Sequence, residues 1–320
     1  MNSIDNGMFV VKKLKRNKYE AYFVGGCVRD YLLNQQVNDI DITTNATPNQ
    51  VMALFKNAKP TGLKYGTVTV LHDLHNIEVT TYRVDGTYLD YRRPEEVFLT
   101  DLVTEDVKRR DFTINGLLMD ENYKIYDYID GQKDLENKTI RAIGNPNERF
   151  NEDALRLLRA TYFQAKLGFS IEAETKAAMK ANASKIDHLP NERILNEVLK
   201  MLAEKHQIEG LKTIEETTLS RHLPGLEKGI KYINQNFKER VFIDTFFALC
   251  FSLNGFVDER WKFSNIHKNK YQKVVELVIA EKDIDKFVLY EYGLEISTLA
   301  NKILFLLGKK PNQKTRIKNM

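Results

Sequence analysis

The sequence predicts an α+β protein in which an α/β head precedes a longer, all-helical part. Up to about residue 125, runs rich in β-branched residues alternate with helical runs, and beyond it helical periodicity continues almost to the C-terminus. The 320 residues, 42% hydrophobic and 29% charged, are typical of a globular protein large enough for two or three domains. We expect a head at 1–124, a helical neck at 125–205 and a helical body at 206–320.

Short apolar runs in the head have the alternation and β-branched content of strands. These runs are AYFV (21–24), IDIT (40–43), TVTVL (67–71) and IEVTTYRV (77–84). The turn residues HDLHN between the last two runs predict a hairpin. Helices are predicted over 28–34 and 48–57, the second with Thr47 as its N-cap and Pro48 at its first position.

Helical periodicity after the head predicts helices over 152–166, 172–182, 191–203 and 271–280. The aromatic residues between Val241 and Phe251 have the spacing of a helix core, and we expect them and Trp261 to pack in the interior. The C-terminal segment 308–320 carries five basic residues and no acid, which suits a solvated end or one that contacts phosphate.

Composition narrows the class of protein further. The net charge of +4 leans weakly towards an anionic partner. Two cysteines, Cys27 and Cys250, exclude a disulfide framework and favour a reducing compartment. The N-terminal segment lacks the apolar core and cleavage site of a secretory signal, and no apolar run approaches the roughly 18 residues of a membrane span. We therefore expect a cytoplasmic protein.

A glycine pair follows the first predicted strand, within the stretch FVGGCVRDYLLNQQVNDIDITTNATP (23–48). Gly25 and Gly26 let the backbone turn sharply and approach a ligand, and the helix that follows presents unpaired N–H groups to an anion. Arg29 could add a charge-assisted contact to a phosphate. Taken alone this is a weak signal, because any strand-to-helix turn can use two glycines.

Two aspartates at the next predicted strand strengthen the interpretation of the glycine pair as part of a phosphate-binding site. Asp39 and Asp41 are two residues apart, so their side chains point to the same face, where two carboxylates repel each other unless a cation lies between them. Mg²⁺ binds such carboxylates together with substrate phosphate oxygens, and a metal pair of this kind catalyses nucleotidyl transfer. An exposed strand or an Asx turn is the alternative, and the flanking isoleucines argue against the turn. Glu78, on the second hairpin strand, is a candidate third carboxylate or an ordinary solvent-facing residue.

The chain resembles the class II tRNA nucleotidyltransferase and bacterial poly(A) polymerase superfamily, and most closely the CCA-adding enzymes of low-GC Gram-positive bacteria. Besides the stretch already described, four segments carry the resemblance in order. They are RRDFTINGL (109–117), DYIDGQKDLENKTIRAIGNP (127–146), RFNEDALRLLR (149–159) and PNERILNEVLKML (190–202).

The resemblance implies a polymerase-β-like nucleotidyltransferase head followed by a helical neck and body, with the family's tail domain missing or shortened. It implies Mg²⁺ as cofactor, held by Asp39 and Asp41. It further implies a nucleotide site and an RNA-binding end. The nucleotide-binding candidates are Gly25, Gly26, Arg29, Arg110, Asp111, Asp153, Arg156 and Arg159. The RNA-binding candidates are Lys309, Lys310, Lys314 and Arg316.

The implied activity is the addition of C, C and A to the 3′ end of tRNA, from CTP and ATP, without a nucleic acid template and with release of pyrophosphate. The alternatives are a poly(A) polymerase, an enzyme that adds only CC or only A, and, more remotely, a non-catalytic RNA-binding protein. The sequence does not predict an oligomeric state.

The segment NEDALRLLR suggests how the base is chosen. Asp153 and Arg156 are three residues apart on a predicted helix, so their side chains are neighbours, and the simplest interpretation is a solvated ion pair. Facing a nucleotide, however, Asp only accepts hydrogen bonds and Arg only donates them. Cytosine and adenine each show an amino donor beside a ring acceptor, whereas uracil and guanine show the reverse. The pair could therefore accept CTP and ATP and reject UTP and GTP.

Some positions depart from the family pattern or have an open role. Tyr162 stands where related bacterial enzymes usually have an arginine, and it either weakens a phosphate contact or replaces it by stacking. The segment Thr81–Leu99 resembles the flexible loop that helps the family switch from C to A, and an ordinary exposed loop is the alternative. Residues 191–197, NERILNE, are expected to brace the nucleotide-reading helix.

Overall fold

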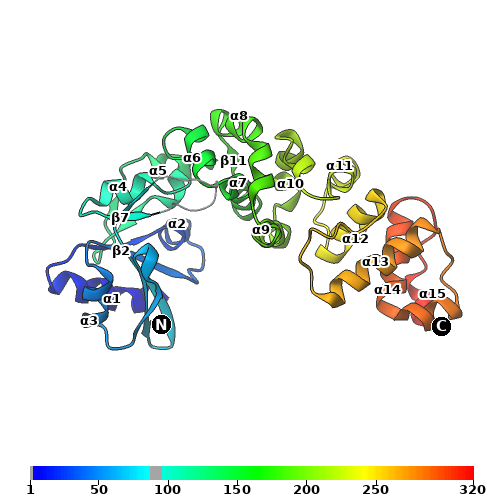
Figure 1. Cartoon of the computed structure of the whole chain (residues 1–320), viewed down its shortest axis with the longest axis horizontal. Helices are drawn as coiled ribbons and strands as arrows, with labels where there is room; N and C mark the ends of the chain where they lie inside the picture. Colours follow the sequence, from blue (N-terminus) through cyan, green and yellow to red (C-terminus); the bar gives the residue numbers. More distant parts are fainter. Residues whose placement is uncertain (1–2, 87–95) are drawn as a thin grey trace. The chain divides into compact units, whose positions relative to one another are not determined.

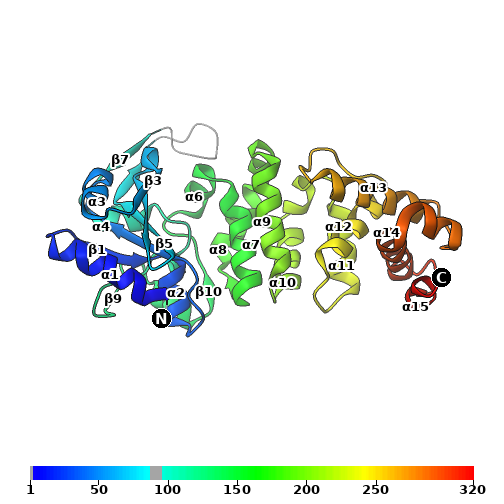
Figure 2. The same ribbon diagram turned by 90° about the horizontal axis from the view of Figure 1, so that it is seen from below.

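The structure, a computed structural model, describes residues 3–86 and 96–320. The chain forms two units (Figures 1 and 2). The first contains residues 1–156 and 170–175, and the second contains residues 157–169 and 176–320. The predicted α/β head and helical remainder are confirmed, while the three predicted domain ranges stay a prediction.

A mixed sheet of seven strands, in the order β3-β4-β5-β2-β1-β8-β9, organises the first unit. β2 and β5 are parallel, and every other neighbouring pair in this sheet is antiparallel. The strands are β1 (Ala21–Val24), β2 (Ile40–Thr44), β3 (Ala58–Gly62), β4 (Thr67–His72), β5 (His75–Thr81), β8 (Leu118–Met119) and β9 (Ile125–Tyr126). The central strands β1 and β2 match their predicted positions, because their alternating apolar residues are buried in the core.

Helices α1 and α3 pack against this sheet and against each other, and α2 contacts β1 and β2 (Figure 1). The helices of the unit are α1 (Ser3–Arg16), α2 (Gly26–Leu32), α3 (Pro48–Leu54), α4 (Val103–Lys108), α5 (Gly131–Glu136) and α6 (Pro146–Glu152), with 3₁₀ turns η1 (Leu63–Tyr65) and η2 (Thr113–Asn115). Two small sheets pair β6 (Arg83–Asp85) with β7 (Val97–Leu99) and β10 (Thr139–Ile140) with β11 (Ser170–Ile171). Thr47 caps α3 as predicted, and its partner in a reciprocal capping box is Gln50.

The predicted hairpin is present between β4 and β5, where His72 pairs with His75. The two residues between them, Asp73 and Leu74, have φ values of 43° and 65°. Two consecutive left-handed residues are what a two-residue hairpin loop requires to match the twist of its strands. The predicted strand 77–84 was too long, because the chain leaves the main sheet after Thr81 and continues as β6 in another sheet.

The second unit is a succession of helices in which, from residue 191 onward, neighbours along the chain pack against one another (Figure 2). They are α7 (Leu155–Leu167), α8 (Ala173–Ala181), α9 (Asn191–Ala203), α10 (Gln207–Glu216), α11 (Glu227–Asn236), α12 (Ile243–Asn254), α13 (Asn265–Ile279), α14 (Lys286–Leu306) and α15 (Lys314–Lys318), with 3₁₀ turns η3 (Ala183–His188) and η4 (Leu219–His222). The boundary between the units falls within α7 and α8. In the described ranges, no helix is both long enough and apolar enough to span a membrane.

An aromatic cluster fills the core of this unit, as the spacing of the aromatic residues predicts. Phe247 packs against Phe251, Trp261 and Tyr271, with ring centroids 5.9 to 6.3 Å apart. The indole N–H of Trp261 donates to the Pro224 carbonyl at 2.6 Å, so its polar atom is satisfied inside the core. The role of these aromatic residues is therefore structural.

Close packing between α11 and α12 generates a prediction for Gly229. A Cβ at this buried glycine would lie 2.3 Å from Sγ and 2.5 Å from Cα of Cys250. We expect Gly229→Ala to lower the free energy of unfolding of the second unit by about 1–3 kcal/mol, because the backbone of α12 cannot yield. This clash outweighs the helix preference of alanine over glycine, about 1 kcal/mol. Urea unfolding followed by the fluorescence of Trp261, the single tryptophan, measures it.

The matched control for this prediction is Lys228→Ala, on the exposed side of the same helix. It should change the free energy of unfolding by less than about 0.5 kcal/mol. If Gly229→Ala and Lys228→Ala have equal free energies of unfolding, α11 and α12 can move apart at little cost in free energy, which would contradict the prediction.

Candidate active site

The glycine turn between β1 and α2 has a conformation that only glycine adopts readily. Gly25 has φ 77° and ψ −140°, in the left-handed half of conformational space. A Cβ at this position would lie 3.4 Å from Oδ2 of Asp41 and 3.9 Å from Nη1 of Arg110. Gly25 thus lies beside both a candidate metal ligand and a candidate nucleotide contact. The helix begins at Gly26, slightly before its predicted start.

Three carboxylates lie near this turn. Asp41 is on β2, and the parallel register of β2 with β5 places it opposite Glu78. Asp39 lies one residue before the first residue of β2, so the predicted strand placement holds for Asp41 alone. Burial and, after it, the charges of Glu78 and Asp39 raise the pKa of Asp41 to about 6, although Arg110 opposes the shift. A carboxylate in this setting favours a nearby cation.

The donor set fits a metal that takes part of its coordination from a substrate. Within the described ranges, no group of three or more His, Cys, Asp or Glu side chains is placed to hold a metal ion. Asp39 and Asp41 therefore supply too few ligands for a dedicated protein cage, but Mg²⁺ commonly binds through one or two carboxylates plus substrate phosphates and water. Glu78 as a third catalytic carboxylate stays a prediction.

Arg29 is buried, with 2% of its surface exposed. Its Nε donates to Oδ1 of Asp30 at 2.7 Å, and its Nη1 donates to Oδ1 of Asn115 at 2.6 Å. Asn115 in turn donates through Nδ2 to Oδ1 of Asp111 at 3.1 Å. These bonds join α2 to the segment after α4, so Arg29 and Asp111 hold the site together. Their predicted contacts with triphosphate and ribose stay predictions.

Sequence reasoning missed a buried acid, Asp106, on α4. Its side chain is fully buried and accepts hydrogen bonds from Nε of Arg109 at 2.9 Å and from Nη2 of Arg110 at 2.9 Å. The hydroxyl of Thr43 donates to it at 3.0 Å. Burial disfavours the charged form, but Arg110 and Arg109 outweigh it and hold the pKa of Asp106 at about 2. An acid three and four residues before two arginines was the available signal.

The predicted helix over 152–166 is wrong at its start. Helix α6 ends at Glu152, and Asp153 has extended backbone angles, φ −137° and ψ 104°. The carboxylate of Asp153 accepts the backbone N–H of Leu155 at 3.0 Å, so it caps α7 instead of continuing α6. Asp153 and Arg156 are therefore not neighbours on one helix, as the spacing had suggested: Asp153 precedes α7, and Arg156 lies in its first turn.

Arg156, in the first turn of α7, is held firmly by the protein. Its Nη1 donates to Oε2 of Glu152 at 2.6 Å and to the Arg149 carbonyl at 3.0 Å, and its Nη2 donates to the Arg109 carbonyl at 2.8 Å. Glu152 also pairs with Arg149. Glu152 is a second residue that sequence reasoning missed, and its place directly before Asp153 was the signal that could have revealed it.

Arg159 and Tyr162 lie further along α7, in the second unit. The guanidinium of Arg159 lies 5.2 Å from the ring centroid of Phe163, and the ring of Tyr162 lies 5.1 Å from the same ring. Their predicted roles toward a nucleotide stay predictions. Of the predicted loop Thr81–Leu99, the ends form the pair of β6 and β7, and 87–95 lie outside the described residues.

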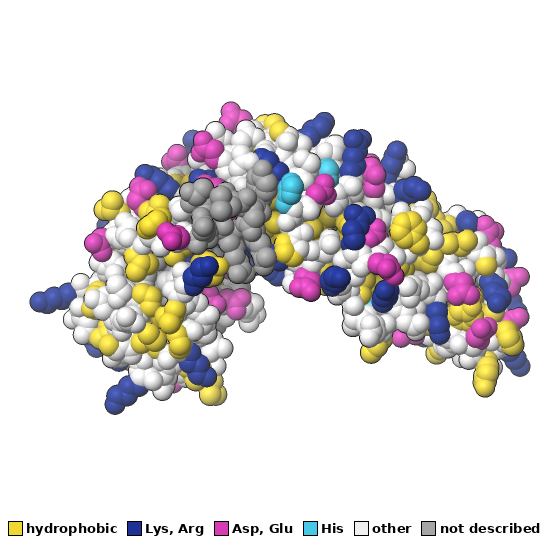
Figure 3. Space-filling model, viewed as in Figure 1, with side chains coloured by type: hydrophobic (Ala, Val, Ile, Leu, Met, Phe, Trp, Pro, Cys, Tyr) yellow, Lys and Arg dark blue, Asp and Glu magenta, His cyan; other side chains and the backbone are white. Residues whose placement is uncertain are grey.

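The predicted RNA-binding lysines fall into two groups. Lys309 pairs with Glu281 at 2.7 Å and Lys310 with Asp283 at 2.9 Å, so their charges are partly balanced. On the face of the second unit drawn in Figure 3, basic and acidic side chains are likewise interspersed. Lys314 instead lines a cavity of about 690 Å³ formed by α12, α14 and α15. Arg316 is exposed on α15.

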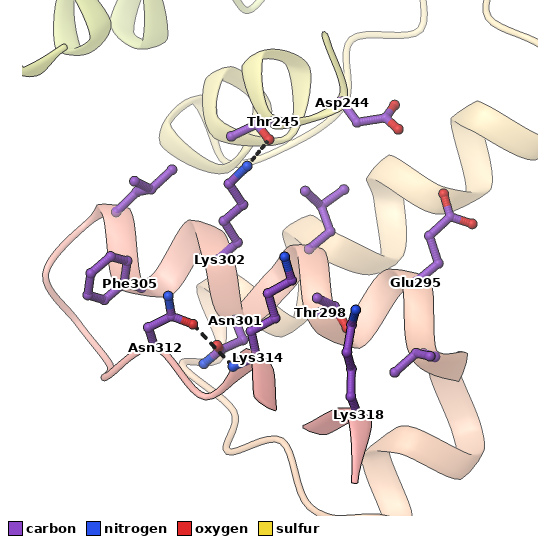
Figure 4. A pocket seen from close by; sticks show the side chains of 13 residues that line it. Asp244, Thr245, Glu295, Thr298, Asn301, Lys302, Phe305, Asn312, Lys314 and Lys318 are labelled. Carbon is purple, nitrogen blue, oxygen red and sulfur yellow. Dashed lines mark hydrogen bonds between the residues drawn. The ribbon is translucent and has the colours of Figure 1, made fainter. Parts of the chain in front are cut away.

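Three lysines line this cavity (Figure 4). Lys302 reaches Oγ1 of Thr245 at 3.0 Å, and Lys314 and Lys318 project from α15. Much of the remaining lining is apolar, including Leu299 and Phe305. Asp244 and Glu295 also line the cavity, so it combines three lysines, two acids and an apolar wall.

Comparisons with known proteins place the chain in a family. The family model "Poly A polymerase head domain" matches residues 21–141, and "Probable RNA and SrmB- binding site of polymerase A" matches residues 168–230. The CCA-adding enzyme of Bacillus cytotoxicus is 37% identical over 96% of this chain and 80% of its own length. That of Oceanobacillus iheyensis is 47% identical over 72% of this chain and 58% of its own length.

The solved structures give the same result. The crystal structure of the Bacillus stearothermophilus CCA-adding enzyme in complex with CTP aligns with 100% of this chain and 82% of its own, at 31% identity and a TM-score of 0.83. Likeness at this level extends over both units, from the glycine turn to the last helix. The chain therefore belongs to the CCA-adding enzyme family.

Proposed function

We propose that this protein adds C, C and A to the 3′ end of tRNA from CTP and ATP, without a nucleic acid template and with release of pyrophosphate. One observation carries the proposal: Gly25, Asp41 and Arg110 meet at one point, in a chain that belongs to the CCA-adding enzymes. A related enzyme at 31% identity was solved with CTP. The two buried free thiols suit a reducing cytoplasm, where we place the activity.

The protein's own groups position the reactants in this scheme. The backbone at Gly25 allows the triphosphate to approach, and Arg110 donates hydrogen bonds to phosphate oxygens. Asp39 and Asp41 hold Mg²⁺. When bound, Mg²⁺ stabilises negative charge on the attacking and leaving oxygens of nucleotidyl transfer. Arg29 fixes α2 against Asn115, which keeps the glycine turn in place.

Base selection rests on Asp153 and Arg156. Arg156 is fixed by its bonds to Glu152, Arg149 and Arg109, so its guanidinium has a defined position before the nucleotide arrives. Asp153 is fixed by its cap on α7. A rigid acceptor and a rigid donor suit the amino and ring-nitrogen edges of cytosine and adenine, and a wrong base would leave polar groups mispaired at about 1–3 kcal/mol each.

The RNA partner is held in part by the lysines of the second unit. Lys314 has no acid partner among the described residues. It shares its cavity with Lys302 and Lys318 and with two acids, Asp244 and Glu295, and the remaining positive charge favours contact with RNA phosphates. Lys309 and Lys310 contribute less because each already pairs with an acid. Arg316 remains a further candidate on α15.

Nucleotide incorporation tests the proposed activity directly. We expect wild-type protein to add C, C and A in that order to tRNA ending before its CCA, and then to stop. UTP and GTP should not be incorporated, because their base edges mismatch Asp153 and Arg156. The measurement supplies each labelled nucleotide singly and CTP with ATP together, and resolves products by length. Asp41→Ala should abolish incorporation while tRNA binding persists.

Other products would change the assignment. Long A tails would identify a poly(A) polymerase, and a stop after CC would remove the switching role of Thr81–Leu99. RNA binding with no incorporation would favour a non-catalytic RNA-binding protein. Activity in Asp41→Ala would overturn the metal assignment.

The pKa of Asp41 predicts how pH affects the stability of metal-free protein. Its folded pKa of about 6 exceeds the ordinary 3.8, so the folded state gains stability from this proton at low pH and loses it as pH rises from about 4 through 6. Asp41→Asn avoids this loss. The free energy of unfolding of Asp41→Asn should exceed that of the wild type by an amount that grows from near zero at pH 4 to about 1–3 kcal/mol at pH 7. Amide hydrogen exchange in β2, with EDTA present, measures it.

Asp101→Asn is the control for this experiment, because it makes the same substitution at an exposed position. Its difference from wild type should stay constant across the pH range. An Asp41→Asn advantage that does not change with pH would contradict the raised pKa.

Two double variants test the RNA-binding lysines with the same loss of charge. We expect Lys314→Ala with Lys318→Ala to weaken tRNA binding and to reduce the slope of log affinity against log salt by about 1–2. Lys309→Ala with Lys310→Ala should have a smaller effect, since acids already balance these charges. Binding measured between 50 and 200 mM salt, about the range in which counterion release is resolved, decides it. If the two double variants weaken tRNA binding equally, the lysines of the cavity have no greater role in RNA binding than Lys309 and Lys310.

A further inference from the structure

The buried carboxylate of Asp106 connects β2, the strand that carries the candidate metal ligand Asp41, to Arg110. Thr43 follows Asp41 by two residues on β2, so the two side chains project to the same face of the sheet. Thr43 donates to Oδ2 of Asp106 at 3.0 Å, and Arg110 donates to the same oxygen at 2.9 Å. One oxygen atom thus ties Arg110 to the strand that carries Asp41.

The two ends of the Arg110 guanidinium have different surroundings. Nη2 is bound to Asp106, whereas Nη1 lies 3.9 Å from the point that a Cβ on Gly25 would occupy. Oδ2 of Asp41 lies 3.4 Å from the same point. In the described part of the chain, the side chain of Arg110 donates a hydrogen bond from Nη2, and its buried Nε has no partner. Donors of Arg110 therefore stay available for a ligand at the glycine turn.

Asp106 also limits where Arg110 can go. Without it, the positive guanidinium would be drawn toward Asp41, the candidate metal ligand that lies beside the same point at Gly25. Arg109 takes the other oxygen of Asp106, with Nε at 2.9 Å, so both carboxylate oxygens are used and the carboxylate cannot rotate. A fully buried acid with three donors on it is a rigid anchor.

We propose that Asp106 is a positioning residue for nucleotidyl transfer, which acts through Arg110 by holding its Nη1 toward the triphosphate and away from Asp41. This inference rests on the proposed function, because it assigns the ligand at Gly25 as a nucleoside triphosphate. The effect should be the same for CTP and ATP, since Arg110 contacts the part that the two nucleotides share.

A double-mutant cycle tests this inference with the full chain. We expect Asp106→Asn to raise the KM for CTP and for ATP by an equal factor of about ten, while the KM for tRNA stays unchanged. In the Arg110→Ala background the same substitution should add less than about twofold, because its effect passes through Arg110. Glu105→Gln, an exposed acid on the same helix, is the matched control and should leave both constants unchanged.

The opposite results would overturn the inference. If Asp106→Asn lowers only kcat or only the folded fraction, Asp106 has a purely structural role. An equal rise in KM with Arg110 absent would show that it does not act through Arg110. If Asp106→Asn fails to fold, Thr43→Val takes its place in the cycle, with an expected rise of about two- to threefold. No rise in that variant would likewise overturn the inference.

To separate this inference from the proposed function, the same double-mutant cycle is repeated with the Kd for CTP measured in place of KM. Wild-type protein that binds CTP but transfers no nucleotide would refute the proposed function, and the cycle in Kd would still decide the role of Asp106. Protein that binds neither CTP nor ATP would refute both.

Discussion

The carboxylate of Asp41 lies half-buried beside two other carboxylates, and the groups around the glycine turn respond to the cost of that charge. The parallel register of β2 with β5 brings Glu78 opposite it, and Asp39 lies just before the strand. Among the described residues, Arg110 opposes these charges. The raised pKa of Asp41 means that its ionised form is disfavoured in this setting, and that a nearby cation would favour it.

Much of the first unit could be predicted because its signals are local. A few adjacent residues are enough to predict each of three features: the turn at Asp73 and Leu74, the glycine pair, and the alternation of β2. Asp106 could not be recognised in this way. An acid before two arginines on a helix is usually a solvated ion pair, and its burial depends on Thr43, which is distant in sequence.

Asp153 shows the limit of arguments from helical spacing. The pattern from 152 to 166 is periodic enough for one helix, but the side chain of Asp153 gains more by capping α7 than by continuing α6. The base-reading role of Asp153 and Arg156 therefore stays a prediction, while their expected place on one helix was wrong. The same limit applies to Lys309 and Lys310. The sequence shows their positive charge, but only the structure shows that each is paired with an acid.

The bond from Arg156 to the Arg109 carbonyl has a consequence for engineering the enzyme. It links the residue proposed to read the base to the backbone next to Arg110, which is proposed to hold the phosphates. A substitution at Arg156 intended to admit UTP or GTP would also release that backbone. With the roles proposed for Arg156 and Arg110, the choice of nucleotide and the binding of phosphate are coupled through this bond. We therefore expect a variant with a relaxed choice of nucleotide to need replacement support for that backbone from a second position.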